Sequence, residues 1–421
     1  MITITTQNRS LKFIIVVVLL ALLLTLSAWI VERQLVSTRH THFDFYLLWR
    51  GSQEVLAGRS PYTDAIMLDI QRHTLGHPAA PDENQYRFVY PAYLALILFP
   101  LPLLPFPVAA TWWLVWQLLL LTLFIIFLLR ALDWHIGLKT LLGLTLMAIS
   151  FRYTLITFVW GQSSIFILCL LAAALWLWRR GLDLWCGACL AIATVKPQLL
   201  LVILPVWLFF AWRQRRWQVW ISFGVTMGVL IFLPWLFIGN WIAGVWSQVR
   251  PYWGYTGASA LMTILPRFLP SAPLRTAGQV GGSLALLGYV AWLCRQKRDM
   301  ADTGDLALIL AVAVVVTLMV VPLSWAYDIV LCLFPVFLGL EQLQSHREPV
   351  ARALYGVLWL TSVVSWLINT LLPLAFDAMG WKYNVWTADK IIIPALIFVV
   401  LIYILHHDDR RRNQVSPIVS V

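Results

Sequence analysis

Charged side chains are scarce in this chain. Lys, Arg, Asp and Glu make up 12% of its 421 residues, about half the share found in a soluble domain. The sequence also lacks an Asp-x-Asp pair, a glycine-rich phosphate loop and a dinucleotide-binding fingerprint. The shortage of charge excludes an ordinary soluble protein. The missing motifs argue against a soluble nucleotide sugar or a dinucleotide as a substrate.

Metal-ligand patterns are missing as well. Cys186-x-x-Cys189 has the spacing of a redox or metal pair, but no second pair of cysteines or histidines accompanies it. His40 and His42 likewise have no partner at metal-ligand spacing. We therefore expect no metal site and no cofactor, and we interpret Cys186 and Cys189 as small packing residues within a helix.

Long apolar runs dominate what the chain does contain, since 61% of its residues are hydrophobic. Several runs are long enough to cross a bilayer, which takes roughly 20 residues of helix. The clearest are residues 13–31, 110–129, 219–238, 306–321 and 391–405. The first run lacks a small-residue cleavage pattern, so we expect a retained helix. These features predict an all-α, multi-pass membrane protein with a single integral-membrane domain over residues 1–421.

The net charge of +11 is gathered in short clusters between the apolar runs. Such clusters are orientation signals that stay in the cytoplasm, so we expect no nucleic-acid partner. The predicted cytoplasmic clusters lie at residues 9–12, 130–139, 179–180, 213–216, 295–298, 347–352 and 410–412. Their alternation with connections poor in Lys and Arg predicts about twelve spans, both termini in the cytoplasm and a short cytoplasmic tail at 406–421.

One segment fits two interpretations. Residues 91–107 are apolar but contain Pro91, Pro100, Pro102, Pro105 and Pro107. The segment either crosses the membrane or forms a re-entrant or interfacial piece. The charge pattern favours the second interpretation, and broken backbone at membrane depth then needs protein or water to satisfy its polar groups.

The first extracytoplasmic loop, residues 32–91, is the longest polar stretch of the chain. Within it, residues 44–57 have the spacing of an amphipathic helix lying on the membrane surface, with Gly58 as a C-terminal cap. The expected apolar face is Phe45, Leu48, Ser52, Val55 and Leu56. Asp44 falls in the first turn or at the N-cap. From the residues alone, Asp44 is either a helix cap or a functional carboxylate.

Several short motifs in the first half carry a resemblance to a known family. They are Asp44-Phe45-Tyr46-x-x-Trp49-Arg50-Gly51, Leu56-Ala57-Gly58-Arg59-Ser60-Pro61-Tyr62, Phe88-Val89-Tyr90-Pro91, Leu101-Pro102-Leu103-Leu104-Pro105, Gly161-Gln162-Ser163 and Lys196-Pro197-Gln198. Taken in this order and spacing, they resemble glycosyltransferase family 87. The second half is similar only in its hydropathy and in Ser324-Trp325.

The resemblance implies an integral-membrane glycosyltransferase of the C-type fold, with interfacial helices in a large first extracytoplasmic loop. It implies that Asp44 is the catalytic carboxylate. Family members often carry a histidine soon after the Ser-Trp pair, whereas this chain continues Ala326-Tyr327-Asp328. Tyr327 or Asp328 is therefore the expected substitute for that histidine.

Sugar transfer from a lipid phosphate also needs positive charge to stabilise the leaving phosphate. Lys196 is the first candidate, because a charge near membrane depth is usually functional; snorkelling to the interface is the alternative. Arg87 is the second, with an ordinary loop residue as the alternative. Turn formation by Gln162 and N-capping by Asp328 are the alternatives to substrate contact. We expect Tyr252, Trp253 and Tyr255 to anchor the chain at the interface, or else to stack on a sugar ring or the isoprenoid. The expected substrate-binding residues are Tyr62, Gln162, Tyr327 and Asp328.

The predicted function is transfer of a hexose from a polyprenyl-phosphate donor to a hydroxyl of a lipid- or glycan-linked acceptor. Mannose is expected by family analogy alone. The expected partners are this donor, this acceptor and membrane lipids. The expected location is the inner (plasma) membrane, with the active site facing the periplasm. The alternative is a transporter or flippase for a lipid-linked sugar, which usually shows internal repeats; the sequence has no convincing repeat.

Overall fold

The computed structural model describes residues 43–81, 83–256, 269, 271–297, 303–322, 325–378 and 385–415. The predicted span at 13–31, His40, His42, Ser324 and the end of the predicted tail lie outside the described residues. Every regular element in the described part is helical. In chain order these are α2 (Phe43–Leu56), α3 (Asp64–Leu75), α4 (Leu94–Leu98), η2 (Leu101–Leu103), α5 (Phe106–Leu132), α6 (Leu138–Ser150), α7 (Arg152–Trp160), α8 (Ser164–Arg179), α9 (Asp183–Ala193), η3 (Pro197–Leu200), α10 (Ile203–Arg213), α11 (Trp217–Ile238), α12 (Trp241–Thr256), α14 (Ala272–Gln296), α15 (Thr303–Val320), η4 (Ala326–Cys332), α16 (Leu333–Leu343), α17 (Pro349–Trp359), α18 (Thr361–Ala378) and α19 (Val385–Val415).

Four helical segments of the described chain are long and apolar enough to cross a membrane: α5, α11, α14 and the combined η4–α16 segment. Two bent pairs each add one more span if the pair crosses as a unit. These are α6 with α7, bent by 54°, and α17 with the first part of α18, bent by 60°. The chain is therefore a helical membrane protein, as the apolar runs predicted. The expected number of about twelve spans stays a prediction.

The most buried helices are α8, α15, η4 and α16, and α5 and α9 pack beside them, whereas α11 lies at the outside with most of its residues exposed. The closest partners are α5 with α8, α9 with α11, and α8 with α9. Helix α15 packs against α10, α14, α16 and α19, and its side chains from Asp305 to Met319 are all buried. The apolar run at 306–321 is therefore a helix covered by protein on every side, which explains why it shows no amphipathic stripe.

Small residues bring α9 and α11 together. A Cβ atom at Gly187 would lie 2.3 Å from the backbone oxygen of Val219, a separation that real Cβ atoms do not show. Cys186, the neighbour of Gly187, is completely buried in α9. The Cys186-x-x-Cys189 segment therefore lies at a close contact between two helices.

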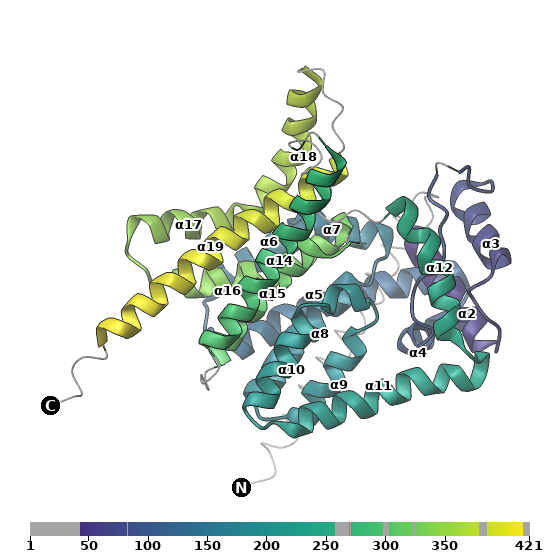
Figure 1. Cartoon of the computed structure of the whole chain (residues 1–421), viewed down its shortest axis with the longest axis horizontal. Coiled ribbons are helices and arrows are strands. Elements are labelled where there is room, and N and C mark those ends of the chain that lie inside the picture. The colour runs from purple at the N-terminus through teal and green to yellow at the C-terminus, as the bar shows by residue number, and fades with distance from the viewer. Residues whose placement is uncertain are drawn as a thin grey trace, which may run out of the picture.

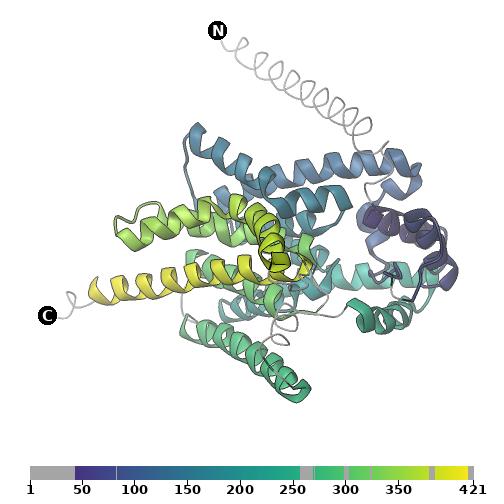
Figure 2. The ribbon, with the colours of Figure 1, turned by 90° about the horizontal axis from the view of Figure 1, so that it is seen from above.

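The first loop forms the end of the molecule where α2, α3, α4 and α12 gather, away from the C-terminal end of α19 (Figure 1, Figure 2). Helix α2 is the predicted amphipathic helix, and Gly58 follows it with φ +71°. On its expected apolar face, Phe45, Leu48, Ser52 and Val55 are buried. Glu54, which is not part of that face, is buried as well.

The burial of Glu54 has an electrostatic cause. Its carboxylate forms ion pairs with Arg50 and Arg59, and Arg50 also pairs with Asp69 of α3 at 2.6 Å. Two guanidinium groups therefore compensate the buried charge. This network joins α2 to α3 and fixes the orientation of α2.

The proline-rich segment 91–107 contains no long helix. Helix α4 has five residues and η2 has three, and α5 begins at Phe106. At about 1.5 Å per residue, α4 covers only a small part of a bilayer. The broken backbone packs against α2 and α5. A re-entrant or interfacial placement stays a prediction.

Candidate functional site

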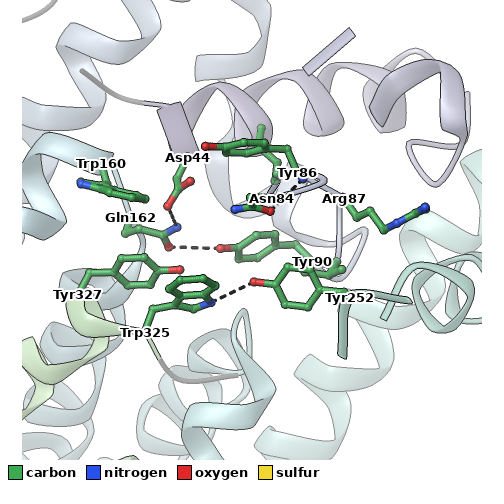
Figure 3. Close-up of a pocket in the computed structure, with 12 residues that line it drawn as sticks. Asp44, Asn84, Tyr86, Arg87, Tyr90, Trp160, Gln162, Tyr252, Trp325 and Tyr327 are labelled. Carbon is green, nitrogen blue, oxygen red and sulfur yellow. Dashed lines mark hydrogen bonds between the residues drawn. The ribbon is translucent and has the colours of Figure 1, made fainter. Parts of the chain in front are cut away.

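Two adjoining cavities lie where the first loop meets the helix bundle. The first has a volume of about 260 Å³ and the second about 290 Å³. The walls come from α2, the 84–91 loop, the turn after α7, α12 and the start of η4 (Figure 3). The residues that line both cavities are Val89, Tyr90, Tyr252, Trp325 and Tyr327. Segments far apart in the sequence therefore share one site.

Asp44 supplies the carboxylate of the first cavity. It lies in the first turn of α2, and its Oδ2 accepts a hydrogen bond from Gln162 Nε2 at 2.6 Å. The Oε1 atom of Gln162 accepts a hydrogen bond from the hydroxyl of Tyr90 at 3.2 Å (Figure 3). Phenol, amide and carboxylate thus form one hydrogen-bonded chain, which orients the carboxylate within the cavity.

The end of α7 sets the position of Gln162. Gly161 ends this helix with φ +68°, a conformation that glycine adopts without strain. Its amide donates to the carbonyl of Phe158, and its carbonyl accepts from Trp113 Nε1 at 2.7 Å. Because α8 begins at Ser164, the short turn between α7 and α8 holds Gln162 in place. The predicted turn role and the contact with Asp44 are therefore both present.

Asp44 binds its proton more tightly than an ordinary aspartate. Burial raises the pKa of Asp44 from 3.8 to about 6. The hydrogen bond from Gln162 and the charge of Lys196 lower this pKa, whereas the charge of Asp328 raises it further. The side chain keeps partial access to the cavity. Burial also raises the pKa of Tyr90, so this phenol stays protonated. Asp44 is therefore ionised at neutral pH and more basic than usual, which suits a general base.

A buried ion pair forms the polar part of the second cavity. Lys196 Nζ lies 3.0 Å from Asp328 Oδ1 and donates to Ser164 Oγ at 3.1 Å. It also lies 4.5 Å from the centre of the Tyr327 ring, within the range of a cation–π contact. Lys196 is 2% exposed and Asp328 is 1% exposed. Because protein encloses the ammonium group, snorkelling does not describe this lysine.

The segment after α9 brings Lys196 to this position. Helix α9 ends at Ala193, and Pro197 opens the short helix η3. Lys196 thus lies at a break between two helices, where Pro197 cannot donate a backbone hydrogen bond. Asp328 lies in η4 and accepts a hydrogen bond from the backbone amide of Trp325 at 2.9 Å. Trp325 is the N-cap of η4, and Asp328, three residues further on, bonds back to its amide, so Asp328 supports the start of the helix without being the cap residue itself.

The loop between α3 and α4 is held from both sides. A Cβ atom at Gly51 of α2 would lie 2.3 Å from the ring of Phe88, so only glycine lets this ring pack against the helix. On the other side, the ring of Tyr62 lies against Gly244 of α12, and its hydroxyl donates to the carbonyl of Tyr90 at 2.9 Å. Tyr62 is buried and lines neither cavity. The hydroxyl and ring of Tyr62 therefore support the loop, and its expected contact with the substrate stays a prediction.

Arg87 lines the first cavity, whereas Lys196 lines the second. The guanidinium group of Arg87 points away from Asp44 (Figure 3). It donates to Gln248 Oε1 at 2.9 Å and lies 3.7 Å from Asp64 Oδ1. The two cations expected to bind one phosphate are thus in different cavities, because Gln248 and Asp64 hold Arg87 on the far side of the loop.

The sequence reasoning missed three parts of the site. Tyr90 was noted only within a family motif, although it joins both cavities and donates to Gln162. Ser164 carried no signal of its own. Trp325 Nε1 donates to the hydroxyl of Tyr252 at 3.0 Å, which links α12 to η4 in the shared wall. A single sequence gives no indication of such a contact.

Comparison with known proteins gives one match. Residues 88–322 match the sequence model of glycosyltransferase family 87, which is more than half of the 421 residues. The matched range includes Gln162 and Lys196, whereas Asp44 precedes it and Asp328 follows it. No curated protein and no solved structure matches the chain.

Proposed function

Since the chain belongs to glycosyltransferase family 87 and is thus a membrane glycosyltransferase, we propose that it moves a hexose from a polyprenyl-phosphate donor to a hydroxyl of a lipid- or glycan-linked acceptor. The observation that carries this proposal is the pairing of two sites. Asp44, with a pKa of about 6, faces one cavity, and the buried ammonium of Lys196 faces the adjoining one. Mannose as the hexose rests on family analogy alone.

In the proposed reaction, Asp44 is the general base. The acceptor hydroxyl gives its proton to Asp44 while its oxygen forms a bond to the anomeric carbon of the donor sugar. The bond between that carbon and the phosphate oxygen breaks, and its electron pair leaves with the polyprenyl phosphate. A base with a pKa near the working pH is effective in such a proton transfer. Gln162 holds the carboxylate toward the acceptor through its 2.6 Å hydrogen bond.

Lys196 stabilises the leaving phosphate in the second cavity. Negative charge grows on the phosphate oxygen as the glycosidic bond breaks, and a fixed positive charge in an enclosed site stabilises it more than water does. The same cavity has apolar walls that suit the first units of an isoprenoid chain. These walls come from Val89, Pro91, Val195, Pro197, Val245, Trp246 and Val249.

We place the site on the periplasmic side of the inner membrane, with both termini in the cytoplasm. The support is the alternation of basic clusters along the sequence. On this topology the whole chain is one membrane domain of the C-type fold with about twelve spans. Residues 32–91 form the periplasmic loop that carries Asp44, and residues 406–421 form the cytoplasmic tail.

The test is an assay of purified protein in detergent with radiolabelled polyprenyl-phosphate mannose and a glycolipid acceptor. We expect the donor to be consumed and the label to appear on the acceptor. A transporter or flippase leaves the donor intact in detergent, because no membrane separates two compartments there. Intact donor with every sugar tried in the same polyprenyl-phosphate form would refute the proposed function.

A further inference from the structure

The carboxylate of Asp328 is fully occupied by protein donors. Its Oδ1 accepts hydrogen bonds from Ser164 Oγ at 2.6 Å and from Lys196 Nζ at 3.0 Å. Its Oδ2 accepts from the backbone amide of Trp325 at 2.9 Å. With 1% of its surface exposed, Asp328 has almost no surface left for a sugar hydroxyl. The expected substrate contact of Asp328 therefore does not fit its geometry.

The same contacts compensate the charge of Lys196. An ammonium group that is 2% exposed has lost most of its hydration, which is costly for a charged group. The carboxylate 3.0 Å away compensates the charge. An ammonium group has three N–H donors, and two of them serve Ser164 and Asp328 in the described part of the chain. One donor thus remains for a ligand in the second cavity.

We propose that Asp328 is a positioning residue, which compensates the charge of Lys196 and directs its remaining N–H toward the second cavity. The ligand there is a phosphate ester, so this inference rests on the proposed function. Asp328 itself touches neither the sugar nor the phosphate. Its role is to make a buried lysine usable as an anion-binding group, and Ser164 holds both partners at the required distance.

Groups from three helices act on the ammonium of Lys196. From η4, Asp328 and the Tyr327 ring face the ammonium; from α8, the hydroxyl of Ser164 does. The charge of Asp44 of α2 also acts on the pair. Among the described residues, Asp328 provides the ion pair that the structure shows for Lys196.

The first experiment compares the steady-state kinetics of the wild-type protein and Asp328→Asn. Asparagine has nearly the same size, but its single oxygen can accept from Ser164 or from the Trp325 amide and not from both. We expect the KM for the donor to rise by at least about tenfold, because the ammonium group of Lys196 loses its charged partner and its orientation. The KM for the donor rises more than kcat falls.

The matched control is Asp305→Asn. Asp305 forms a comparable buried pair with Lys297 at 3.5 Å, with both side chains 3% exposed, and it lines neither cavity. This variant also breaks a buried ion pair, but we expect its KM for the donor to equal that of the wild-type protein. A KM for the donor in Asp328→Asn that does not exceed the KM in Asp305→Asn would overturn the inference.

A double-mutant cycle tests whether Asp328 acts through Lys196. In a Lys196→Gln background, Asp328→Asn should cause little further loss, because the group that Asp328 positions is already gone. Additive losses from the two substitutions would contradict the inference. If the wild-type protein does not consume the donor at all, the proposed function fails. Consumption of the donor by wild type together with additive losses refutes only the role of Asp328.

Discussion

The substitution Asp44→Asn separates the catalytic interpretation of this residue from the structural one. Asparagine keeps the size of the side chain, accepts a hydrogen bond from Gln162 as aspartate does, and is an equally good helix cap. It cannot take a proton from an acceptor hydroxyl. If Asp44 is the general base, we expect kcat to fall by roughly two to four orders of magnitude.

The structure also gives the sign of the effect on stability. Burial raises the pKa of Asp44 from 3.8 to about 6, so the folded protein favours the protonated form. The stability that this preference contributes is present below pH 3.8 and is lost as the pH rises through about 6. At neutral pH, where Asp44 is ionised, the raised pKa therefore lowers the free energy of unfolding by at most about 3 kcal/mol. Asp44→Asn removes this cost, so the variant should be more stable than wild type at pH 7 and nearly inactive.

Both quantities are measured on one preparation. Thermal unfolding is followed as a function of pH, and transfer rates are followed with the radiolabelled donor. Wild-type activity should fall as the pH drops through about 6, because the protonated carboxyl cannot act as a base. A stable Asp44→Asn protein that turns over at the wild-type rate would refute the reasoning.

Four further predictions follow from the same contacts. Gln162→Ala removes a hydrogen bond that lowers the pKa of Asp44, so the acidic limb of the pH–rate profile should move to higher pH; an unmoved limb contradicts this. Lys196→Ala should weaken donor use strongly and Lys196→Arg less, and normal donor kinetics in the alanine variant would count against a phosphate-binding role. Gly187→Val should lower the thermal unfolding temperature, because the valine side chain would collide with the backbone of α11. Gly224→Val is the control, since a Cβ atom at position 224 meets open space. Arg215→Cys should be protected from impermeant thiol reagents in intact cells, and labelling from outside would reverse the topology.

The sequence predicted the helical class because the length and apolarity of a run are enough to identify a membrane helix. It predicted α2 and its cap because Gly58 and the spacing of Phe45, Leu48 and Val55 are local signals. It did not predict that α15 is covered on all sides, since an apolar run facing lipid and one facing protein have the same composition. The buried state of Glu54 depends on partners at other positions in the fold, so helical spacing alone missed it.

For the site, the sequence reasoning found residues whose charge is unusual for their surroundings. Lys196 stands out at the end of an apolar stretch, whereas Asp44 was singled out by the family resemblance, and the structure brings the two to adjoining cavities. It could not find which charges pair with each other, because pairs such as Lys196 with Asp328 span 132 positions. It could not find that Tyr62 supports the loop behind the cavities, since a single sequence does not distinguish a tyrosine that faces a cavity from one that supports its wall.

The shared wall of the two cavities limits how substitutions can change the substrate specificity of the enzyme. On the proposed function, Tyr90, Tyr252, Trp325 and Tyr327 face the donor on one side and the acceptor on the other. A substitution in this wall alters both binding volumes at once. Adaptation to a new acceptor through these positions therefore also changes the affinity for the lipid donor. Independent adaptation is open only to residues that line one cavity, such as Asn84 on the acceptor side and Trp246 on the donor side.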